Sequence, residues 1–138
     1  MEKTNFEKLR VYKLAETLAD RIWDVVLKWD YLAQDTIGKQ MIRAADSIGA
    51  NIAEGTGRGT LRDNRRFIRM ARGSLYETQH WLRRAYKRAL LSKQQVESIK
   101  PIISELSPTL NAYFRSVNQA AVDQTKRSTK YKVQSSKA

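Results

Sequence analysis

Cysteine is absent from this chain of 138 residues, and histidine occurs only once. Without cysteine, the chain can form no disulfide, no thiolate metal site and no cysteine nucleophile. A single histidine also excludes a metal site built from several imidazoles. We therefore expect neither a bound metal nor a cofactor.

Proline, glycine and long hydrophobic runs are scarce as well. With two prolines and six glycines, the chain is expected to form long regular elements. No stretch reaches the roughly 18 consecutive apolar residues of a membrane span, and the first residues lack the basic-then-apolar order of a signal peptide. We expect a cytoplasmic protein with no membrane partner. Its hydrophobic content of 41% is enough for the core of one domain.

Acidic residues are few in two segments where basic residues gather. The net charge is +12, with ten Lys or Arg against two acids in residues 58–88 and five against one in residues 123–138. The rest of the chain holds eleven of each sign. A localised positive excess favours a polyanionic partner such as nucleic acid.

Four stretches show the periodicity of amphipathic helices. Apolar residues recur every three or four positions in residues 5–30, 34–54, 61–90 and 92–118. No strand pattern occurs, and the connections are short. The prediction is an all-α fold, an antiparallel up-down-up-down four-helix bundle over residues 1–120. After residue 118 the apolar period stops, so residues 121–138 are predicted to be a flexible basic tail.

Local signals set the expected helix ends. Gly55 is predicted to end the second helix, and Ser92 with Gln95 forms a capping box at the start of the fourth. Pro101 and Pro108 interrupt the fourth helix, but their spacing of seven residues puts both on the side opposite the apolar stripe. Two alternatives follow: a curved helix with both prolines facing solvent, or a break at Pro108.

The apolar side of the first helix is wider than one neighbouring helix requires. Tyr12, Ala19 and Trp23 flank the main stripe. They indicate either a broad core face or a contact with another subunit.

A basic side runs along the predicted third helix, opposite its buried stripe. Arginines lie three and four residues apart with almost no acids between them, so their mutual repulsion favours a bound anion. The guanidinium group suits phosphate because it donates two parallel hydrogen bonds. The alternative is an ordinary solvated charged face. The residues predicted to bind nucleic acid on this side are Arg58, Arg62, Arg65, Arg66, Arg69, Arg72, Tyr76, His80, Arg83, Arg84 and Lys87.

The flat side chains of this set and the tail have separate roles. Tyr76 and His80 could stack on bases, or could instead face a neighbouring subunit. The predicted tail would add non-specific attraction through Lys126, Arg127, Lys130 and Lys132.

The chain offers little for catalysis. His80 has only Glu77, three residues earlier, as an acidic neighbour at helical spacing, and such a pair is more often a surface contact. We expect no enzyme activity and no catalytic residue.

The residues that follow carry a resemblance to a known family. The central run is Gln40-x-x-Arg43-Ala44-Ala45-x-Ser47-Ile48-x-x-Asn51-Ile52-Ala53-Glu54-Gly55-x-Gly57-Arg58. A later run is Phe67-x-x-x-Ala71-x-Gly73-Ser74-x-x-Glu77, and the opening has Phe6-x-x-Leu9-x-Val11-Tyr12. Together they resemble the bacterial four-helix-bundle family first noted as 23S rRNA intervening-sequence proteins, over about residues 5–118. Departures from the family are Ala33-Gln34-Asp35, where relatives often carry a proline, and the two prolines of the fourth helix.

The resemblance implies a ring-like homopentamer without catalytic activity. It extends to the accessory variability proteins of diversity-generating retroelements, which are basic pentamers that bind nucleic acid and associate with a reverse transcriptase. The polar residues of the signature are interpreted as an architectural network between the second and third helices or between subunits, rather than as a ligand site. They are Gln40, Arg43, Ser47, Asn51, Glu54, Ser74 and Glu77.

Two functional hypotheses follow. The first is a non-catalytic, oligomeric accessory protein that binds RNA or DNA without reading its sequence, and that assists a reverse transcriptase. The second is a scaffold of the intervening-sequence type, whose basic face docks an acidic protein. A membrane-surface role is disfavoured because the basic helix buries its apolar side in the bundle.

Overall fold

The computed structural model describes residues 5–137, and all of the regular secondary structure in that range is helical. A 3-10 turn, η1 (Phe6–Lys8), precedes helix α1 (Arg10–Val26). A short helix α2 (Tyr31–Ala33) and a π-helical turn η2 (Gln34–Gly38) lead into α3 (Lys39–Gly57). The two remaining helices are α4 (Leu61–Lys87) and α5 (Lys93–Lys137). The predicted all-α class with four long helices is confirmed.

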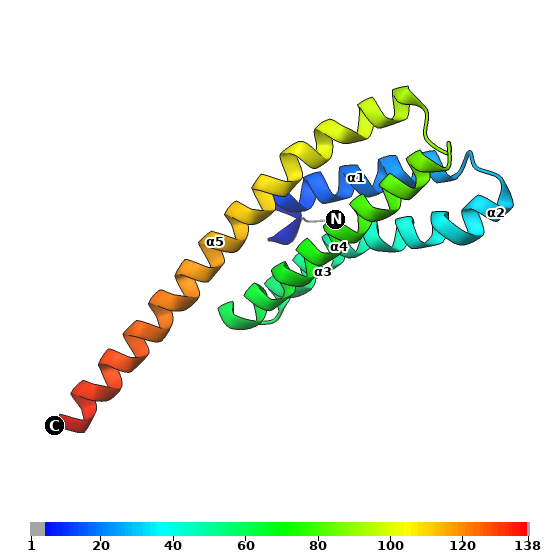
Figure 1. Cartoon of the computed structure of the whole chain (residues 1–138). Helices are drawn as coiled ribbons and strands as arrows, with labels where there is room; N and C mark the ends of the chain where they lie inside the picture. Colours follow the sequence, from blue (N-terminus) through cyan, green and yellow to red (C-terminus); the bar gives the residue numbers. More distant parts are fainter. Residues whose placement is uncertain (1–4, 138) are drawn as a thin grey trace.

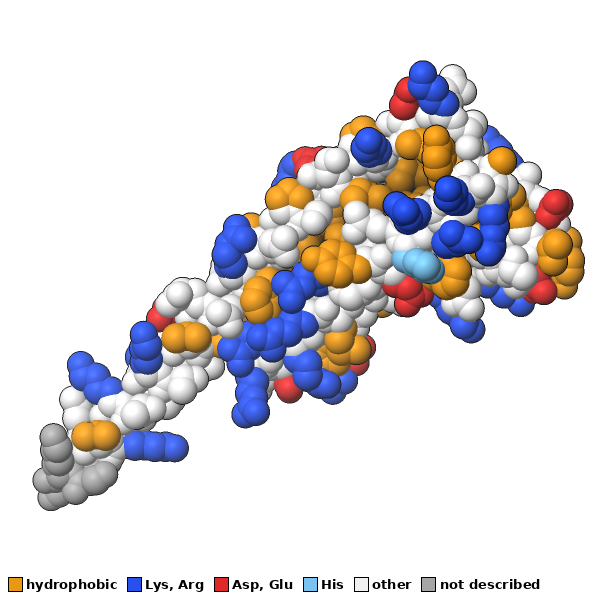
Figure 2. Space-filling view, viewed as in Figure 1, with side chains coloured by type: hydrophobic (Ala, Val, Ile, Leu, Met, Phe, Trp, Pro, Cys, Tyr) orange, Lys and Arg blue, Asp and Glu red, His pale blue; other side chains and the backbone are white. Residues whose placement is uncertain are grey.

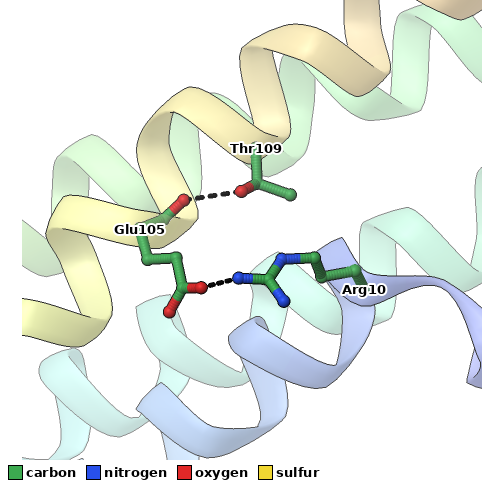
Figure 3. A network of polar contacts seen from close by, with 3 residues as sticks. All are labelled: Arg10, Glu105 and Thr109. Carbon is green, nitrogen blue, oxygen red and sulfur yellow. Dashed lines mark hydrogen bonds and ion pairs between the residues drawn. The ribbon is translucent and has the colours of Figure 1, made fainter.

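The four long helices pack around one core. Helix α3 packs most extensively against α4, α1 packs against α3 and α5, and α4 packs against α5, so each long helix has two long neighbours. Figure 1 shows these helices side by side, with the end of α5 extending past the others. An exposed ion pair between Arg10 and Glu105 joins the start of α1 to α5 (Figure 3).

The predicted apolar stripes form the core. The largest side chains with almost no exposed surface are Leu18, Ile22, Met41, Ile48, Ile52, Ile68, Leu75, Thr78, Leu106 and Leu110. Burial of each large aliphatic side chain contributes about 1.5–3 kcal/mol. The Thr78 hydroxyl donates to the Ser74 carbonyl at 2.8 Å, which satisfies the polar member of this set.

The connection between α1 and α3 is helical rather than an open loop. Asp30 caps α2 by accepting a hydrogen bond from the Ala33 amide at 3.0 Å. The Gln34 amide donates to the carbonyls of Val26 and Leu27, and so caps the end of α1. These polar contacts hold the turn that contains Ala33-Gln34-Asp35.

Two predictions about helix ends are wrong. Gly55 does not end α3, which continues to Gly57. Its role is close packing, because a Cβ there would lie 2.9 Å from the Phe67 Cβ on α4. The third helix, predicted over residues 61–90, ends sooner: α4 stops at Lys87, and Ala89 is exposed with a φ of 58°, in the left-handed region that ends helices.

Helix α5 resolves the alternatives for the prolines. It runs through Pro101 and Pro108 without a break, and both prolines are exposed. Each proline removes a hydrogen bond to the residue four positions earlier. Those residues, Glu97 and Ser104, are exposed, so water can solvate the freed carbonyls. The capping box is confirmed: Ser92 Oγ accepts from the Gln95 amide at 3.1 Å, and Gln95 Oε1 accepts from the Ser92 amide at 2.9 Å.

The predicted loss of regular structure after residue 118 is wrong. Helix α5 continues to Lys137, and Ala121 is still buried. The physical reason is local, since no proline or glycine follows Pro108 and a formed helix propagates readily through alanine, glutamine, lysine and arginine. The absence of an apolar period showed only that this part of α5 has no buried side along most of its length.

Candidate nucleic-acid interface

The predicted basic residues of α4 share one side of the helix and form two groups. The first group lies near the start of α4 and consists of Arg62, Arg65, Arg66, Arg69 and Arg72, with Arg58 just before the helix. The second lies near its end and consists of Arg83, Arg84 and Lys87. Figure 2 shows two gatherings of Lys and Arg on one face, with the single histidine beside the one farther from the α5 extension.

Four of the arginines form cation–π contacts with two phenylalanine rings. The guanidinium carbons of Arg58 and Arg66 lie 4.9 and 4.8 Å from the ring centre of Phe67. Those of Arg69 and Arg72 lie 5.2 and 5.5 Å from the ring centre of Phe114 on α5.

Stacking of this kind restrains the planar guanidinium while its N–H edge stays able to donate. The sequence patterns gave Phe67 and Phe114 no role at the basic side. The sequence gave a partial signal only for Phe67, which directly follows Arg66, because Phe114 lies far along the chain from Arg69 and Arg72.

A fifth arginine is fixed by a hydrogen bond between helices. Arg65 is half-buried, and its Nη1 donates to Oδ1 of Asn118 on α5 at 2.9 Å. Asn118 was the last residue of the predicted fourth helix and had no assigned role. The bond leaves the remaining guanidinium donors of Arg65 able to bind another acceptor.

The basic side is almost free of neutralising carboxylates. Among the predicted binding residues of α4 and the turn before it, only Arg58 forms an ion pair, with the exposed Glu54 at 2.8 Å. Like charges three or four residues apart on α4 therefore repel one another within the chain. A bound polyanion would remove that repulsion.

Two grooves meet at Arg62 and Arg65. One, of about 560 Å³, runs along the start of α4 and includes Asp63, Arg66 and Arg69 in its lining. The other, of about 360 Å³, lies between α4 and α5 and is lined on the α5 side by Ala121, Val122, Gln124, Thr125 and Lys126. The structure thus brings Lys126 beside the arginines of α4, whereas Arg127 and Lys130 are exposed outside the groove lining.

The aromatic residues between the two groups differ in their contacts. Tyr76 is 59% exposed and free to stack. His80 packs edge-on against Trp81, with ring centres 4.8 Å apart. Glu77 accepts a hydrogen bond from Trp81 Nε1 at 3.1 Å. No hydrogen bond joins Glu77 to His80 among the described residues.

The polar signature residues bond within single helices. Ser47 Oγ donates to the Arg43 carbonyl, and Asn51 Nδ2 donates to the Ser47 carbonyl. Gln40 is exposed, and no hydrogen bond in residues 5–137 joins the signature residues of α3 to Ser74 or Glu77. A network between subunits stays a prediction.

A separate groove of about 410 Å³ lies between α1 and α3. Tyr12 and Ala19 line it, together with Asp20 and Asp46, whereas Trp23 is 50% exposed nearby on α1. Burial raises the pKa of the Asp46 carboxyl, and the negative charge of Asp20 raises it further. Burial also raises the pKa of the Tyr12 hydroxyl, as do the charge of Glu16 and its hydrogen bond. Of the residues that widened the predicted apolar side, Tyr12 and Ala19 therefore border a groove and Trp23 is exposed.

The helices and their packing define an all-helical, four-helix protein. The chain belongs to the 23S rRNA-intervening sequence protein family, whose model matches residues 7–112. A crystal structure of a protein of unknown function from the S23 ribosomal protein family of Bacteroides thetaiotaomicron VPI-5482 superposes with a TM-score of 0.66. It is 25% identical, and the match covers 75% of this chain and 97% of that one.

A search of curated proteins finds no match to this sequence. Within the described part of the chain, no helix is both long enough and apolar enough to cross a lipid bilayer. The family match ends before Asn118 and Lys126, so the α4–α5 groove includes residues beyond it.

Proposed function

We propose that this protein is a non-catalytic nucleic-acid-binding accessory protein of the cytoplasm, and that the basic side of α4 holds phosphates without reading base sequence. The observation that carries the proposal is a set of four guanidinium groups that have no carboxylate partner among the described residues: Arg66 on Phe67, Arg69 and Arg72 on Phe114, and Arg65 bonded to Asn118. A restrained guanidinium loses little entropy when it binds phosphate. The second basic group of α4, which consists of Arg83, Arg84 and Lys87, would contact another part of the same nucleic-acid molecule.

Self-association is the second part of the proposal. The four helices would form an antiparallel bundle, and five copies would close into a ring-like homopentamer. Large apolar residues exposed at one end of the bundle support a subunit contact: Trp23, Leu27, Tyr31 and Leu32 are 50–78% exposed. A ring repeats each basic side, so individually weak phosphate contacts multiply into useful affinity.

A reverse transcriptase of a diversity-generating retroelement is the protein partner that we propose. This step rests on the resemblance of the signature residues to accessory variability proteins. An adjacent reverse transcriptase gene with template and variable repeats would support it. Co-purification of the two proteins after nuclease treatment would show direct contact.

A salt titration tests nucleic-acid binding. RNA and DNA oligonucleotides would be titrated with the full chain from 50 to 300 mM salt, about the range over which such contacts weaken. The logarithm of affinity should fall linearly with the logarithm of salt concentration, by about 0.7 per phosphate neutralised on a single strand. Salt-independent binding, or none at low salt, contradicts the proposal. In the latter case an acidic protein becomes the expected occupant of the basic side.

Matched charge variants locate the interface. The double variant Arg66→Gln with Arg69→Gln should reduce affinity. The slope of log affinity against log salt concentration should become shallower by about the contribution of two phosphate contacts. Lys28→Gln with Lys100→Gln removes the same charge from exposed positions on other sides and serves as the control. Equal losses in both pairs would mean that net charge alone attracts the nucleic acid.

A further inference from the structure

The groove between α4 and the extension of α5 differs from an ordinary basic surface. Arg62 and Arg65 stand on one wall and Lys126 on the other. Between them lie aliphatic groups, with Ala121 buried and Val122 half-buried. Among the described residues, no carboxylate lines this groove, whereas Asp63 lines the larger groove along α4. Of the two grooves, therefore, only the smaller one combines basic residues with aliphatic residues in its lining.

We propose that this groove binds an unpaired nucleotide of a single-stranded nucleic acid, an inference that rests on the proposed function. The phosphate would lie between the guanidinium groups of α4 and the Lys126 ammonium group. The base would lie on Ala121 and Val122, with the flat guanidinium of Arg62 beside it.

Chemistry favours a single strand over a duplex in this place. A duplex presents phosphates outside but stacks the faces of its bases inside, so it has nothing to place on the aliphatic floor. An unpaired nucleotide exposes both its phosphate and an apolar base face.

Size points to the same ligand. A groove of about 360 Å³ is at the small end of the range of about 300–1,000 Å³ typical of small-molecule sites. It can take one nucleotide but cannot enclose a double helix. The half-buried Arg65, held by Asn118, lines the groove and is accessible to a flexible strand.

The decisive variant removes the apolar floor while adding charge. Val122→Lys in the full chain raises the net charge by one, so attraction by charge alone would strengthen binding of both single strands and duplexes. Under the proposal, single-strand affinity falls by about fivefold or more, since a base contact is lost, while duplex affinity does not fall. Val133→Lys, an exposed position on the same helix outside the groove, is the matched control.

Fluorescence anisotropy with labelled single-stranded RNA, single-stranded DNA and the corresponding blunt duplexes provides the measurement. The unmodified protein should bind single strands more tightly than duplexes at the same salt concentration. A second pair of variants removes one positive charge each. Lys126→Gln should weaken single-strand binding more than Lys130→Gln does. Both lysines are exposed, so both variants should fold.

The outcomes separate the two proposals. Equal affinity for strands and duplexes, or a gain from Val122→Lys that equals the gain from Val133→Lys, overturns the single-strand site and leaves the general phosphate interface standing. Failure of the unmodified chain to bind any of the four probes overturns both.

Discussion

Arg65 Nη1 on α4 donates a hydrogen bond to Asn118 Oδ1 on α5 across 2.9 Å, although the two residues are 53 positions apart in the chain. The bond ties the arginine-rich start of α4 to α5, the helix whose end extends past the others (Figure 1). The two basic segments of the sequence consequently meet in one region. Lys126, eight residues beyond Asn118, lines the same groove as Arg65.

Removing the ring that supports two arginines should weaken nucleic-acid binding more than it weakens the fold. Phe114→Leu keeps an apolar side chain at this half-buried position but leaves Arg69 and Arg72 without their platform. We expect affinity to fall by about two- to fivefold, the equivalent of about 0.5–1 kcal/mol for a cation–π contact. Phe6→Leu, at a half-buried ring that packs against Tyr12, should leave affinity unchanged in the same binding assay.

Two glycine substitutions should have opposite effects on stability. In Gly55→Ala the new Cβ would meet Asn64 Oδ1 at 2.5 Å and the Phe67 Cβ at 2.9 Å, so α3 and α4 must separate. The expected cost is about 1–3 kcal/mol. In Gly73→Ala, within α4, nothing lies within 4 Å of the new Cβ, and the gain is about 0.5–1 kcal/mol. Urea unfolding of both variants measures the difference, and equal effects would contradict the close packing at Gly55.

The α1–α3 groove should make stability depend on pH through Asp46. Its folded-state pKa is raised by burial and by Asp20, so ionisation of the Asp46 carboxyl costs stability. Stability from this group is complete below the unfolded pKa and is lost as pH rises through the folded pKa. Asp46→Asn should therefore be more stable than the unmodified protein at pH 7, and this advantage should disappear at about pH 3.5, below the ordinary pKa of aspartate.

An NMR titration of the Asp46 carboxyl provides the control for this prediction. Asp20→Asn should bring the pKa of Asp46 closer to its ordinary value, because the second cause of the shift is removed. An unchanged pKa in that variant would show that Asp20 does not act on Asp46.

The start of α5 should depend on its capping box. Ser92→Ala removes the hydroxyl that accepts from the Gln95 amide at 3.1 Å, and the expected loss is about 1 kcal/mol in the free energy of unfolding. Ser116→Ala, at an exposed position inside the same helix, lacks any capping role and should be neutral or slightly stabilising. Thermal and urea unfolding of both variants measure this contrast.

Local sequence signals predicted much of the fold. The three- and four-residue spacing of residues such as Leu18, Ile48 and Leu106 identified core positions, because a helix with one apolar side must bury it. The spacing of Pro101 and Pro108 correctly put both on an exposed side of α5. Each of these signals depends on residues within a few turns of one helix.

Contacts between two helices, and helices without a buried side, could not be predicted from these local patterns. The close approach at Gly55 depends on Phe67 of the next helix, and the sequence offered only a helix-ending interpretation of that glycine. The extension of α5 was missed because an exposed helix has no apolar period, and periodicity was the criterion used.

By itself, then, the sequence determined the helical class, the core positions, the charge of α4 and the family, since composition and periodicity within one helix encode these directly. Only the tertiary structure decided which side chains from different helices meet. Phe114 and Asn118 come to lie against the arginines of α4, and Val122 and Lys126 face Arg62 across a groove, because α4 and α5 pack side by side. Contacts between residues some 50 positions apart depend on how two helices cross, and no pattern within either helix specifies that geometry.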